Sequence, residues 1–361
     1  MPAQAKYLME KFYEKHWEQL KNWKEQKQAM KAIQYLKDFR VIEQEKPEAG
    51  ERDLLVKVEA ISVNPVDYKQ RRKTEAAASQ PVTLGYDAAG TVASVGSEVD
   101  KFKVGDRVYY AGDIKRSGSN ASHQLVDERI VGRCPRSLSF AEAAALPLTG
   151  ITAWEALFTR LGIQIEKDAG RTILIIGGAG GVGSMAIQLA KKVAKLRVVA
   201  TASRKESQDW CLSLGADLCI NHHKDMNHQL EEAGIDVVPF ILCLNNTDGH
   251  FASMTEIIAP QGKICSIVGT SEKHALHPEL FQKSVTFVWE LMFTRPMFSC
   301  SDMEEQHNLL CEIADLIDAK VIQTTMRKNL GPMSVESLRE AHQQLESGST
   351  IGKIVLEGLS A

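Results

Sequence analysis

The sequence predicts an α/β protein in which a mostly β domain is followed by a doubly wound parallel sheet. Between residues 30 and 133, short alternating strands are separated by glycine-containing turns, as in "DLLVKVEAISV", "AAGTVASVG" and "VGDRVYYAG". From Arg171 onward, apolar strands alternate with helices at a short period, which is typical of a parallel sheet. A chain of 361 residues is also long enough for about two domains.

The composition excludes several classes of protein. Hydrophobic content of 44% and charged content of 25% are typical of a globular protein. The net charge of -3 favours neither a nucleic-acid partner nor an anionic membrane. No apolar run reaches the roughly 18 residues that span a bilayer, and no signal peptide opens the chain. The 7 cysteines include no Cys-x-x-Cys pair, so we expect reduced thiols in a cytoplasmic protein.

Residues 1–29 differ from the rest and allow two interpretations. They form either an appended amphipathic helix or a poorly ordered leader ahead of a strand that begins at Met30. The helix is indicated by large apolar residues three or four positions apart: Met9, Tyr13, Trp17, Leu20 and Trp23. A mitochondrial transit peptide is disfavoured because the segment is rich in glutamate.

The second half of the chain predicts six parallel strands. They are expected at 173–176, 197–202, 217–221, 237–244, 263–269 and 284–292. Beyond them come helices over Met303–Ala319 and Val335–Glu346 and a last strand over 352–358. Because this tail does not continue the strand–helix alternation, we expect it to complete the first domain.

The strongest motif is the glycine turn in "ILIIGGAGGVG". Gly178, Gly180 and Gly183 follow a buried strand and open a helix, the context that a dinucleotide-binding turn requires. These glycines let the backbone approach a pyrophosphate, which then meets the positive end of the helix dipole. Gly181 and Val182 lie inside the same turn. We therefore predict a Rossmann domain that binds a dinucleotide.

The end of the next strand indicates which dinucleotide is bound. An NAD site usually places Asp or Glu there, about 20 residues on, to bind the ribose. This chain has Ser203, Arg204 and Lys205 instead. Cations at a helix N-terminus are unfavourable unless an anion lies beside them, and guanidinium binds phosphate well. The segment predicts NADP(H).

Two other strand ends belong to the predicted cofactor site. Val268, Gly269 and Thr270 end a strand at the carboxyl edge of the sheet, where ligands of such sheets bind. Asn245 ends the preceding strand in a similar position. We expect these residues to line the nicotinamide pocket.

The order of motifs resembles the medium-chain dehydrogenase/reductase superfamily from Met30 to Gly358. The motifs are "SVNPVDYKQR", "LGYDAAGTVASVG", "VGDRVYYAG", "AAALPLTGITAWEAL", "GGAGGVG" and "GKIVL". The chain is most similar to the quinone oxidoreductase (zeta-crystallin-like) branch, and within it to bacterial zinc-type alcohol dehydrogenase-like proteins.

This resemblance implies a fold and a division into domains. A GroES-like β barrel would comprise residues 30–152 and 296–361, with the Rossmann domain inserted as residues 153–295 and the active site between them. It also implies a homodimer formed by pairing of edge strands, for which "SVTFVWELM" is the candidate.

The zinc ligands of the family are missing from this chain. Zinc-dependent members have Cys at the position of Asn64, Gly-His-Glu at 85–87 and Cys near Leu148. From Lys31 to Ser122 there is neither Cys nor His, the ligands that zinc prefers. We predict no zinc at the active site, and nothing matches the four closely spaced cysteines of a structural zinc.

The resemblance also assigns site residues. Asn64 would donate a hydrogen bond to cofactor or substrate, Asp67 would orient the loop, and Thr149 would touch the nicotinamide or its ribose. Tyr86 is either an oxyanion donor or a packed tyrosine. Lys353 either closes over the cofactor phosphates or is a surface lysine.

A turn and two pocket loops are also expected. The dipeptide Asn64-Pro65 follows an alternating strand and is predicted to form a turn that ends it. Loops at 74–80 and 292–301 are expected to form the walls of the substrate pocket.

The predicted activity is zinc-independent reduction of quinones or α,β-unsaturated carbonyls by NADPH. These acceptors take hydride directly, whereas oxidising an alcohol without a Lewis acid needs another way to remove its proton. Two alternatives remain open. One is a non-catalytic NADPH-binding sensor or RNA-associated protein, and the other is an alcohol dehydrogenase with unusual ligands.

Overall fold

The computed structural model describes residues 29–77, 80–271 and 277–359. The predicted N-terminal extension therefore lies outside the described residues, apart from Ala29, which begins the first strand. None of the helices in these ranges is long and apolar enough to cross a membrane.

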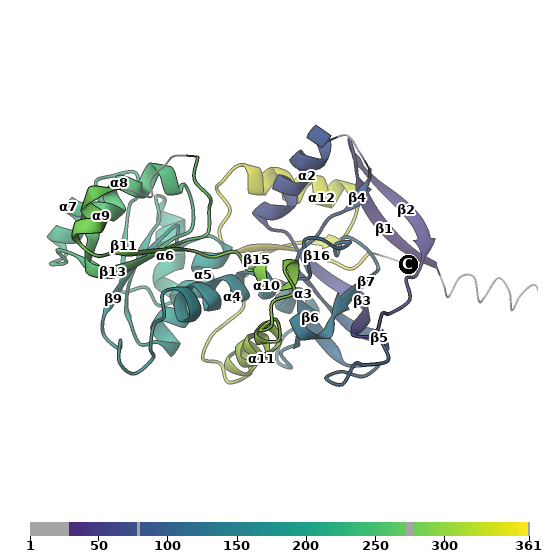
Figure 1. Cartoon of the computed structure of the whole chain (residues 1–361). Helices are drawn as coiled ribbons and strands as arrows, with labels where there is room; N and C mark the ends of the chain where they lie inside the picture. The colour runs from purple at the N-terminus through teal and green to yellow at the C-terminus, as the bar shows by residue number, and fades with distance from the viewer. Residues whose placement is uncertain (1–28, 78–79, 272–276, 360–361) are drawn as a thin grey trace, which may run out of the picture.

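Two large sheets lie at opposite ends of the molecule (Figure 1). The first has the order β15-β16-β3-β5-β6-β8, and β7 pairs with β3. A smaller sheet, β2-β1-β4, lies beside it. Their strands are β1 (Ala29–Tyr35), β2 (Phe39–Glu45), β3 (Asp53–Ser62), β4 (Val82–Thr83), β5 (Ala88–Val95), β6 (Arg107–Tyr110), β7 (His123–Asp127), β8 (Val131–Arg133), β15 (Met326–Pro332) and β16 (Lys353–Glu357).

The second sheet confirms the prediction of six parallel strands. Its order is β11-β10-β9-β12-β13-β14. The central strand β9 reads TILII, an apolar β-branched run suited to a strand covered on both faces. The strands are β9 (Thr172–Ile176), β10 (Arg197–Thr201), β11 (Leu218–Ile220), β12 (Val238–Cys243), β13 (Ile258–Ser266) and β14 (Thr286–Trp289). The helices around it are α5 (Gly181–Gln188), α6 (Lys205–Ser213), α7 (Met226–Glu232), α8 (Thr247–Ile257) and α9 (Pro278–Gln282).

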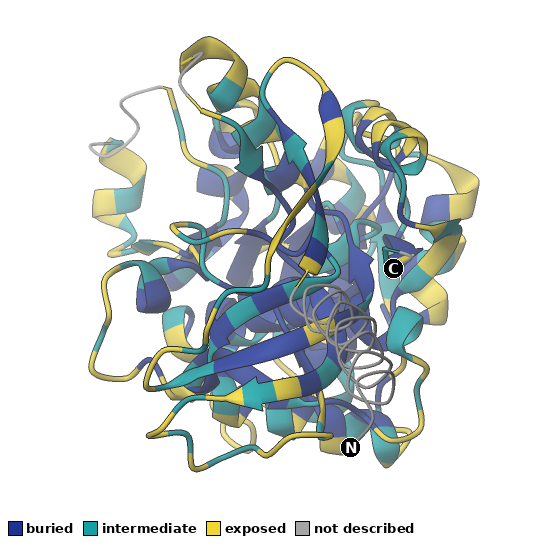
Figure 2. Cartoon of the chain, turned by 90° about the vertical axis from the view of Figure 1, so that its right-hand side faces the viewer, coloured by how far each residue is buried: buried dark blue, intermediate teal, exposed yellow. Residues whose placement is uncertain are grey.

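The tail of the chain returns to the first sheet, as expected. Strand β16 pairs antiparallel with β3, so that Val355 lies opposite Ser62. The other helices are α2 (Pro65–Ala77), α3 (Phe140–Ala144), α4 (Pro147–Trp154), α10 (Thr294–Met297), α11 (Glu305–Asp318) and α12 (Val335–Glu346). In Figure 2 buried residues run along the strands of this end, and exposed residues gather on the surrounding loops and helices.

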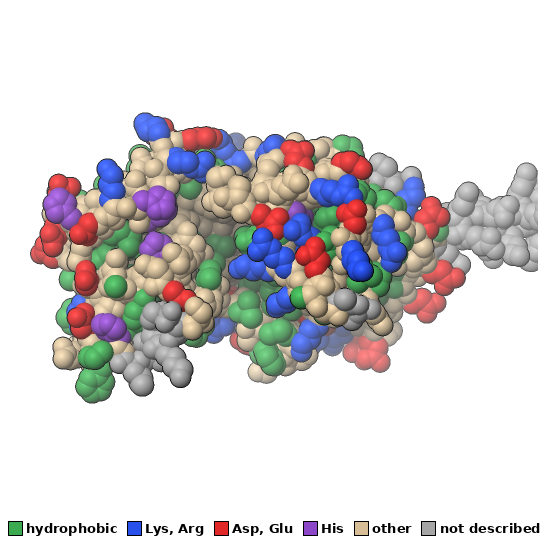
Figure 3. Space-filling model, turned by 90° about the horizontal axis from the view of Figure 1, so that it is seen from above, with side chains coloured by type: hydrophobic (Ala, Val, Ile, Leu, Met, Phe, Trp, Pro, Cys, Tyr) green, Lys and Arg blue, Asp and Glu red, His purple; other side chains and the backbone are tan. Residues whose placement is uncertain are grey.

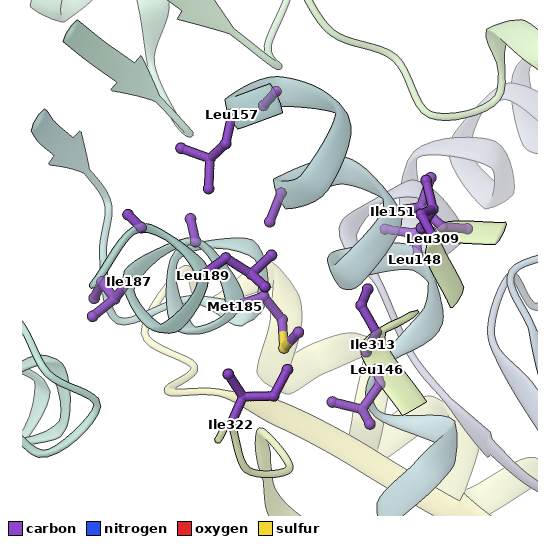
Figure 4. Packing of buried hydrophobic residues seen from close by; sticks show 14 of the residues in the cluster. Leu146, Leu148, Ile151, Leu157, Met185, Ile187, Leu189, Leu309, Ile313 and Ile322 are labelled. Atoms are coloured by element: carbon purple, nitrogen blue, oxygen red, sulfur yellow. The ribbon is translucent and has the colours of Figure 1, made fainter. Parts of the chain in front are cut away.

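An apolar layer joins the two sheets. Helices α4, α5 and α11 direct buried side chains toward one another, including Ile151, Met185 and Ile313 (Figure 4). A Cβ at Gly150 would lie 2.9 Å from Ile313 Cδ1, so a glycine allows α4 and α11 this close approach. The packing holds the glycine turn at the start of α5 in a defined place relative to the first sheet.

The Asn64-Pro65 prediction needs a correction. The strand does end there, but Pro65 begins the 13-residue helix α2 instead of a simple turn. Proline is favoured at the first helical position because its missing amide hydrogen would have no partner there. As a result, Thr74–Ala77 of the expected pocket loop are helical, and so are Thr294–Met297 in the loop at 292–301.

Candidate active site

The glycine turn leaves β9 and opens α5, as the motif predicts. A Cβ on Gly183 would lie 2.5 Å from the carbonyl oxygens of both Gly177 and Gly178. By contrast, a Cβ on Gly180 would have only the Gly177 oxygen nearby, at 3.8 Å. Gly183 is thus required by the fold, whereas Gly180 leaves room at the end of the helix. This cradle, with the first amides of α5, fits a pyrophosphate.

The segment that predicts NADP(H) lies at the start of α6. Arg204 is the residue before the first helical turn, and its guanidinium hydrogen bonds to the backbone oxygen of Ser349. Lys205 pairs with Asp209 along the same helix. Ser203 is half-buried beside them. Arg204 therefore lies at the N-terminus of α6, next to the tail segment that leads into β16.

The other predicted cofactor residues follow β12 and β13 at the carboxyl edge of the sheet. The Asn245 side chain lies by the glycine turn, since a Cβ at Gly177 would be 3.3 Å from its Nδ2. Thr247 Oγ1 donates to the Val268 carbonyl at 2.6 Å. Gly269 is exposed, and Thr270 hydrogen bonds to Asp248. Asn245 thus lies at the glycine turn, and Val268 to Thr270 continue from the next strand end.

The tail of the chain is attached to the glycine turn. The Gly352 amide donates to the Ala179 carbonyl at 2.9 Å, and Gly180 and Gly352 form a parallel bridge. Gly352 has φ 58° and would place a Cβ 2.6 Å from the Thr325 carbonyl, so only glycine fits. The next residue, Lys353, is thereby directed across the turn.

Lys353 is buried among residues of the first sheet. Its ammonium donates to the Val63 carbonyl at 2.9 Å, to Asp87 Oδ2 at 3.0 Å and to Asn64 Oδ1. Its stem lies against the turn, because a Cβ on Gly181 would be 2.7 Å from Lys353 Cδ. The ammonium therefore points away from the place expected for the cofactor phosphates. A contact between Lys353 and the cofactor stays a prediction, and only the stem of the side chain lies at the turn.

Asn64 and Asp87 complete this buried polar cluster. Asn64 Nδ2 donates to Asp87 Oδ2 at 2.8 Å, while the amide of Leu148 donates to Asp87 Oδ1 at 2.8 Å. Both side chains are at most 1% exposed. Burial raises the pKa of Asp87, and Lys353 and Asn64 oppose this effect. In this arrangement the Asn64 amide is engaged within the protein, so its predicted donation to cofactor or substrate is untested.

Asp67 lies in the first turn of α2, below this cluster. Its Oδ2 accepts a hydrogen bond from the Asn64 backbone amide at 2.6 Å, which fixes the chain where the strand becomes helix. Its Oδ1 is buried without a hydrogen-bond partner in the described part of the chain. Burial raises the pKa of Asp67 to about 7, although the Asn64 amide and Lys353 lower it.

Tyr86 combines a buried ring with a hydroxyl that makes no hydrogen bond to the described residues. The residue is only 4% exposed, and its ring packs edge-on against Phe293 with centroids 5.5 Å apart. No described residue hydrogen bonds the hydroxyl. Burial and the neighbouring Asp67 and Asp113 carboxyls raise the pKa of Tyr86, so it remains a neutral donor. The interpretation of Tyr86 as a packed tyrosine therefore holds for its ring. The hydroxyl remains able to donate a hydrogen bond.

Thr149 lies where the glycine turn meets the first sheet. A Cβ on Gly181 would be 3.0 Å from Thr149 Cγ2. Its hydroxyl donates to carbonyl oxygens one turn earlier in the chain, Ala145 at 3.3 Å and Leu146 at 3.2 Å. Thr149 and Lys353 therefore both lie against Gly181. At this glycine the predicted residues near the first sheet meet the predicted glycine turn.

The residues present do not fit a catalytic zinc. Within the described ranges no three His, Cys, Asp or Glu side chains are grouped to hold a metal ion. Asn64 and Tyr86 occupy positions at which the resemblance implies zinc ligands, and the Lys353 ammonium donates a hydrogen bond to the carboxylate of Asp87. A second cation at this carboxylate would be repelled by the first.

One contributor to the site was predicted only as part of a segment, and another was missed. Phe293 lies in the segment 292–301 that is expected to form a pocket wall, but no motif predicts its contact with Tyr86, which depends on how the chain after β14 turns back. Ser62 donates to Asp87 Oδ2 at 3.0 Å, and its position as the last residue of an alternating strand gave no sign of this. Only its proximity in sequence to Asn64 could have suggested a role.

The surface carries mixed charge near the site. Seen from above, the surface is hollowed where the two ends of the molecule meet, and Lys and Arg alternate with Asp and Glu beside the hollow (Figure 3). Arg71 and Arg72, for example, both pair with Glu346. Such compensated cations do not form the continuous basic surface that RNA binding favours.

Comparison with known proteins agrees with this architecture. A family model described as "Alcohol dehydrogenase GroES-like domain" matches residues 50–155, and one described as "Zinc-binding dehydrogenase" matches residues 214–356. A zinc-type alcohol dehydrogenase-like protein of Staphylococcus aureus is 46% identical over 320 residues, covering 88% of this chain and 94% of that protein. The tomato (Solanum lycopersicum) 2-methylene-furan-3-one reductase is 35% identical, covering 86% of this chain and 73% of that protein.

Solved structures give the same picture. A candidate zinc-dependent alcohol dehydrogenase from Rhizobium etli CFN 42 superimposes with a TM-score of 0.86 at 45% identity, covering 92% of this chain and 99% of that one. The quinone oxidoreductase of Coxiella burnetii superimposes with a TM-score of 0.75 at 27% identity, covering 91% of this chain and 99% of that one. A mycobacterial protein complexed with NADPH gives 0.76 at 25% identity, with 91% and 99% covered.

Proposed function

Because the chain belongs to the medium-chain dehydrogenase/reductase superfamily, we propose that it is a zinc-independent reductase that transfers hydride from NADPH to quinones or α,β-unsaturated carbonyls. We place this activity in the cytoplasm. The observation that carries the proposal is the Lys353 ammonium, which donates hydrogen bonds to Asn64 and Asp87, two positions that the resemblance assigns to the metal-ligand segments.

NADPH fits the turn and the basic segment that follows β10. Gly183 permits the tight turn, Gly180 leaves space for the pyrophosphate, and Arg204 at the start of α6 would bind the 2′-phosphate. Bound there, NADPH supplies the hydride. Asn245 and Thr149 lie against opposite parts of the turn and would hold the rest of the cofactor in place.

The acceptor class follows from what the first sheet offers. Reduction of an enone or quinone places negative charge on the carbonyl oxygen, and a neutral donor beside that oxygen lowers the barrier. The free hydroxyl of Tyr86 is such a donor, held in orientation by the Phe293 ring. Oxidising an alcohol would instead require a strong base or a metal at the same place. The tomato relative, named for reduction of a methylene-furanone, supports an enone acceptor.

The test is turnover by the purified full chain. NADPH oxidation should be followed by absorbance with a panel of quinones and enones, and the saturated or hydroquinone products should be identified. We expect consumption of NADPH in preference to NADH, unaffected by a zinc chelator. Absence of turnover with every acceptor, despite tight NADPH binding, would overturn the proposal and favour the sensor alternative. Stoichiometric bound zinc would revive the alcohol dehydrogenase alternative.

We also propose that the protein is a homodimer. Strand β14 is an edge of the parallel sheet. Its last residue, Trp289, is 45% exposed, and Leu291, two residues later, is 49% exposed. An exposed apolar edge strand is a ready surface for pairing with a second copy. Sedimentation should show a dimer for the wild type and a monomer for Trp289→Asp. A monomeric wild type would refute this part.

A further inference from the structure

Two cysteines belong to one apolar cluster next to the glycine turn. Cys211 lies on α6, and Cys219 lies on β11 in register with Ala200 of β10. Registered residues on adjacent parallel strands project from the same face of the sheet. Cys219 and Ala200 accordingly belong to the apolar cluster that also contains Cys211, whereas Val199 belongs to the cluster on the opposite face.

Cys211 covers this face next to the glycine turn. A Cβ built on Gly178 would lie 2.8 Å from the Ala200 Cβ and 3.2 Å from the Cys211 sulfur. The Cys211 thiol also interacts with the thiol of Cys219. That contact is the largest cause of two opposite shifts, raising the pKa of Cys211 and lowering the pKa of Cys219.

The two thiols differ in access. Cys211 is fully buried, with 0% of its surface exposed, while Cys219 is partly exposed. Reactive cysteines in proteins are partly exposed and carry a lowered pKa, and a neighbouring thiol can resolve the first oxidation product. This pair therefore combines a partly exposed cysteine with a fully buried one in the same cluster.

We propose that Cys211 and Cys219 form a reversible oxidation site, at which a peroxide converts the two thiols into a disulfide and weakens binding of the cofactor. The covalent part is independent of the activity proposed above, and the effect on the cofactor rests on it.

The chemistry balances with hydrogen peroxide as the oxidant. The Cys219 thiolate attacks one peroxide oxygen, so an S–O bond forms, the O–O bond breaks and water leaves after taking up a proton. The Cys211 sulfur then attacks the sulfenic sulfur, forming the S–S bond and releasing a second water. Two thiols lose two electrons and two protons, and one peroxide becomes two waters.

The disulfide would change the cofactor site because Cys211 contacts the glycine turn. Bringing the sulfurs to bonding distance, about 2 Å, draws α6 and β11 together. The Cys211 sulfur is in contact with the position of Gly178, and the same helix begins next to Arg204. Both the turn and the predicted 2′-phosphate contact would shift.

The test uses the reduced full-length protein treated with graded hydrogen peroxide, then blocked with N-ethylmaleimide and digested with trypsin. Both cysteines fall in one tryptic peptide, residues 206–224. We expect this peptide to lose two hydrogens and carry no maleimide, and dithiothreitol to reverse the change. In parallel, the Kd for NADPH should rise about tenfold on oxidation of the wild type.

Cys211→Ser and Cys219→Ser serve as matched variants. Each should form no disulfide in this peptide and should keep its NADPH affinity after peroxide. Cys243 and Cys265 provide an internal control, since they are fully buried and lie in clusters on opposite faces of the sheet.

Two results would overturn the proposal. One is a peptide that still carries two maleimides at peroxide doses that oxidise the partly exposed Cys311. The other is a disulfide that forms without change in NADPH affinity. If the reduced protein does not bind NADPH at all, the proposed activity fails, and the peptide mass still decides whether the disulfide forms.

Discussion

The Lys353 ammonium lies 3.0 Å from Asp87 Oδ2, and the two residues are separated by 266 positions in the chain. Their side chains are 4% and 0% exposed. The pair belongs to the group of hydrogen bonds that also holds Asn64 and the Leu148 amide. A buried charge pair of this kind contributes little when complete but is costly to break, because one charge is left in a medium that solvates it poorly.

Lys353→Met should therefore lower the free energy of unfolding by about 3–5 kcal/mol, since it leaves the Asp87 carboxylate without its cation. Urea denaturation measures the change. The matched control is the double variant Lys353→Met with Asp87→Asn, which removes both charges and should recover part of the loss. Equal destabilisation by the single and double variants would show that the ion pair does not hold the cluster.

Two glycines of the turn should separate folding from cofactor binding. Gly183→Ala forces a methyl group to within 2.5 Å of two carbonyl oxygens, so we expect lower stability, by about 1–3 kcal/mol, as well as loss of NADPH binding. Gly180→Ala meets no close protein atom and should retain stability while losing NADPH affinity. Thermal unfolding and NADPH titration of both variants test this. Unchanged affinity in Gly180→Ala would argue against a pyrophosphate at the turn.

The choice of NADPH over NADH should depend on Arg204. A hydrogen bond between charged groups contributes about 1.5–3 kcal/mol, so Arg204→Ala should weaken NADPH binding at least about tenfold and leave NADH binding nearly unchanged. Lys191→Ala is the control, because Lys191 is a cation outside the predicted segment and pairs with Asp217. Kd values for both nucleotides give the result. An equal loss for the two nucleotides would contradict a 2′-phosphate role.

Asp67 should make stability fall as the pH rises. Burial raises its pKa from 3.8 to about 7, so the folded protein holds a proton that the unfolded chain releases above about pH 4. Stability from this group is complete below pH 4 and declines as the pH rises toward 7. The decline should be on the order of a few kcal/mol, because one pKa unit corresponds to about 1.4 kcal/mol.

Asp67→Asn isolates this effect because asparagine does not titrate. Unfolding free energies of the wild type and the variant should be compared at pH 5 and pH 8. The wild type should lose stability relative to the variant between these values. A parallel pH dependence in both proteins would mean that Asp67 is ionised throughout.

Tyr86→Phe should affect turnover and little else. The hydroxyl has no hydrogen-bond partner in the described chain, so its removal should leave stability and NADPH affinity unchanged. Loss of an oxyanion donor typically costs about 100-fold or more in kcat, and we expect about 10- to 100-fold at this single site. Steady-state kinetics with an enone measures the effect. An unchanged kcat would leave Tyr86 as a packing residue.

Much of the fold could be predicted from local patterns. The parallel sheet follows from apolar β-branched runs such as Ile173–Ile176 separated by helical segments, because that pattern depends on neighbours in the chain. The glycine turn is equally local, since its spacing encodes the close approach of α5 to β9. The start of α2 was missed although proline at a first helical position is a known signal.

The buried polar cluster of Lys353, Asn64 and Asp87 could not be predicted in the same way. Lys353 in "GKIV" resembles a phosphate contact or a surface lysine, and its burial depends on the bridge between Gly352 and the glycine turn. The resemblance predicts a role for Asn64 from its position alone, whereas its partners come from β16 and from the segment before β5. Such contacts are properties of the packed chain and leave no pattern in the sequence around each residue.

The bridge between Gly180 and Gly352 also predicts an order of events in folding. The turn and the helix after it are local structures, but the lysine that links them to Asn64 reaches across 289 residues. Contacts between residues so distant in sequence require closure of a long loop and form slowly. A chain whose parallel sheet is already complete would still lack the buried polar cluster of Lys353, Asn64 and Asp87 until β16 docks. We therefore expect the hydrogen bonds around Lys353 to form late in folding, when β16 docks.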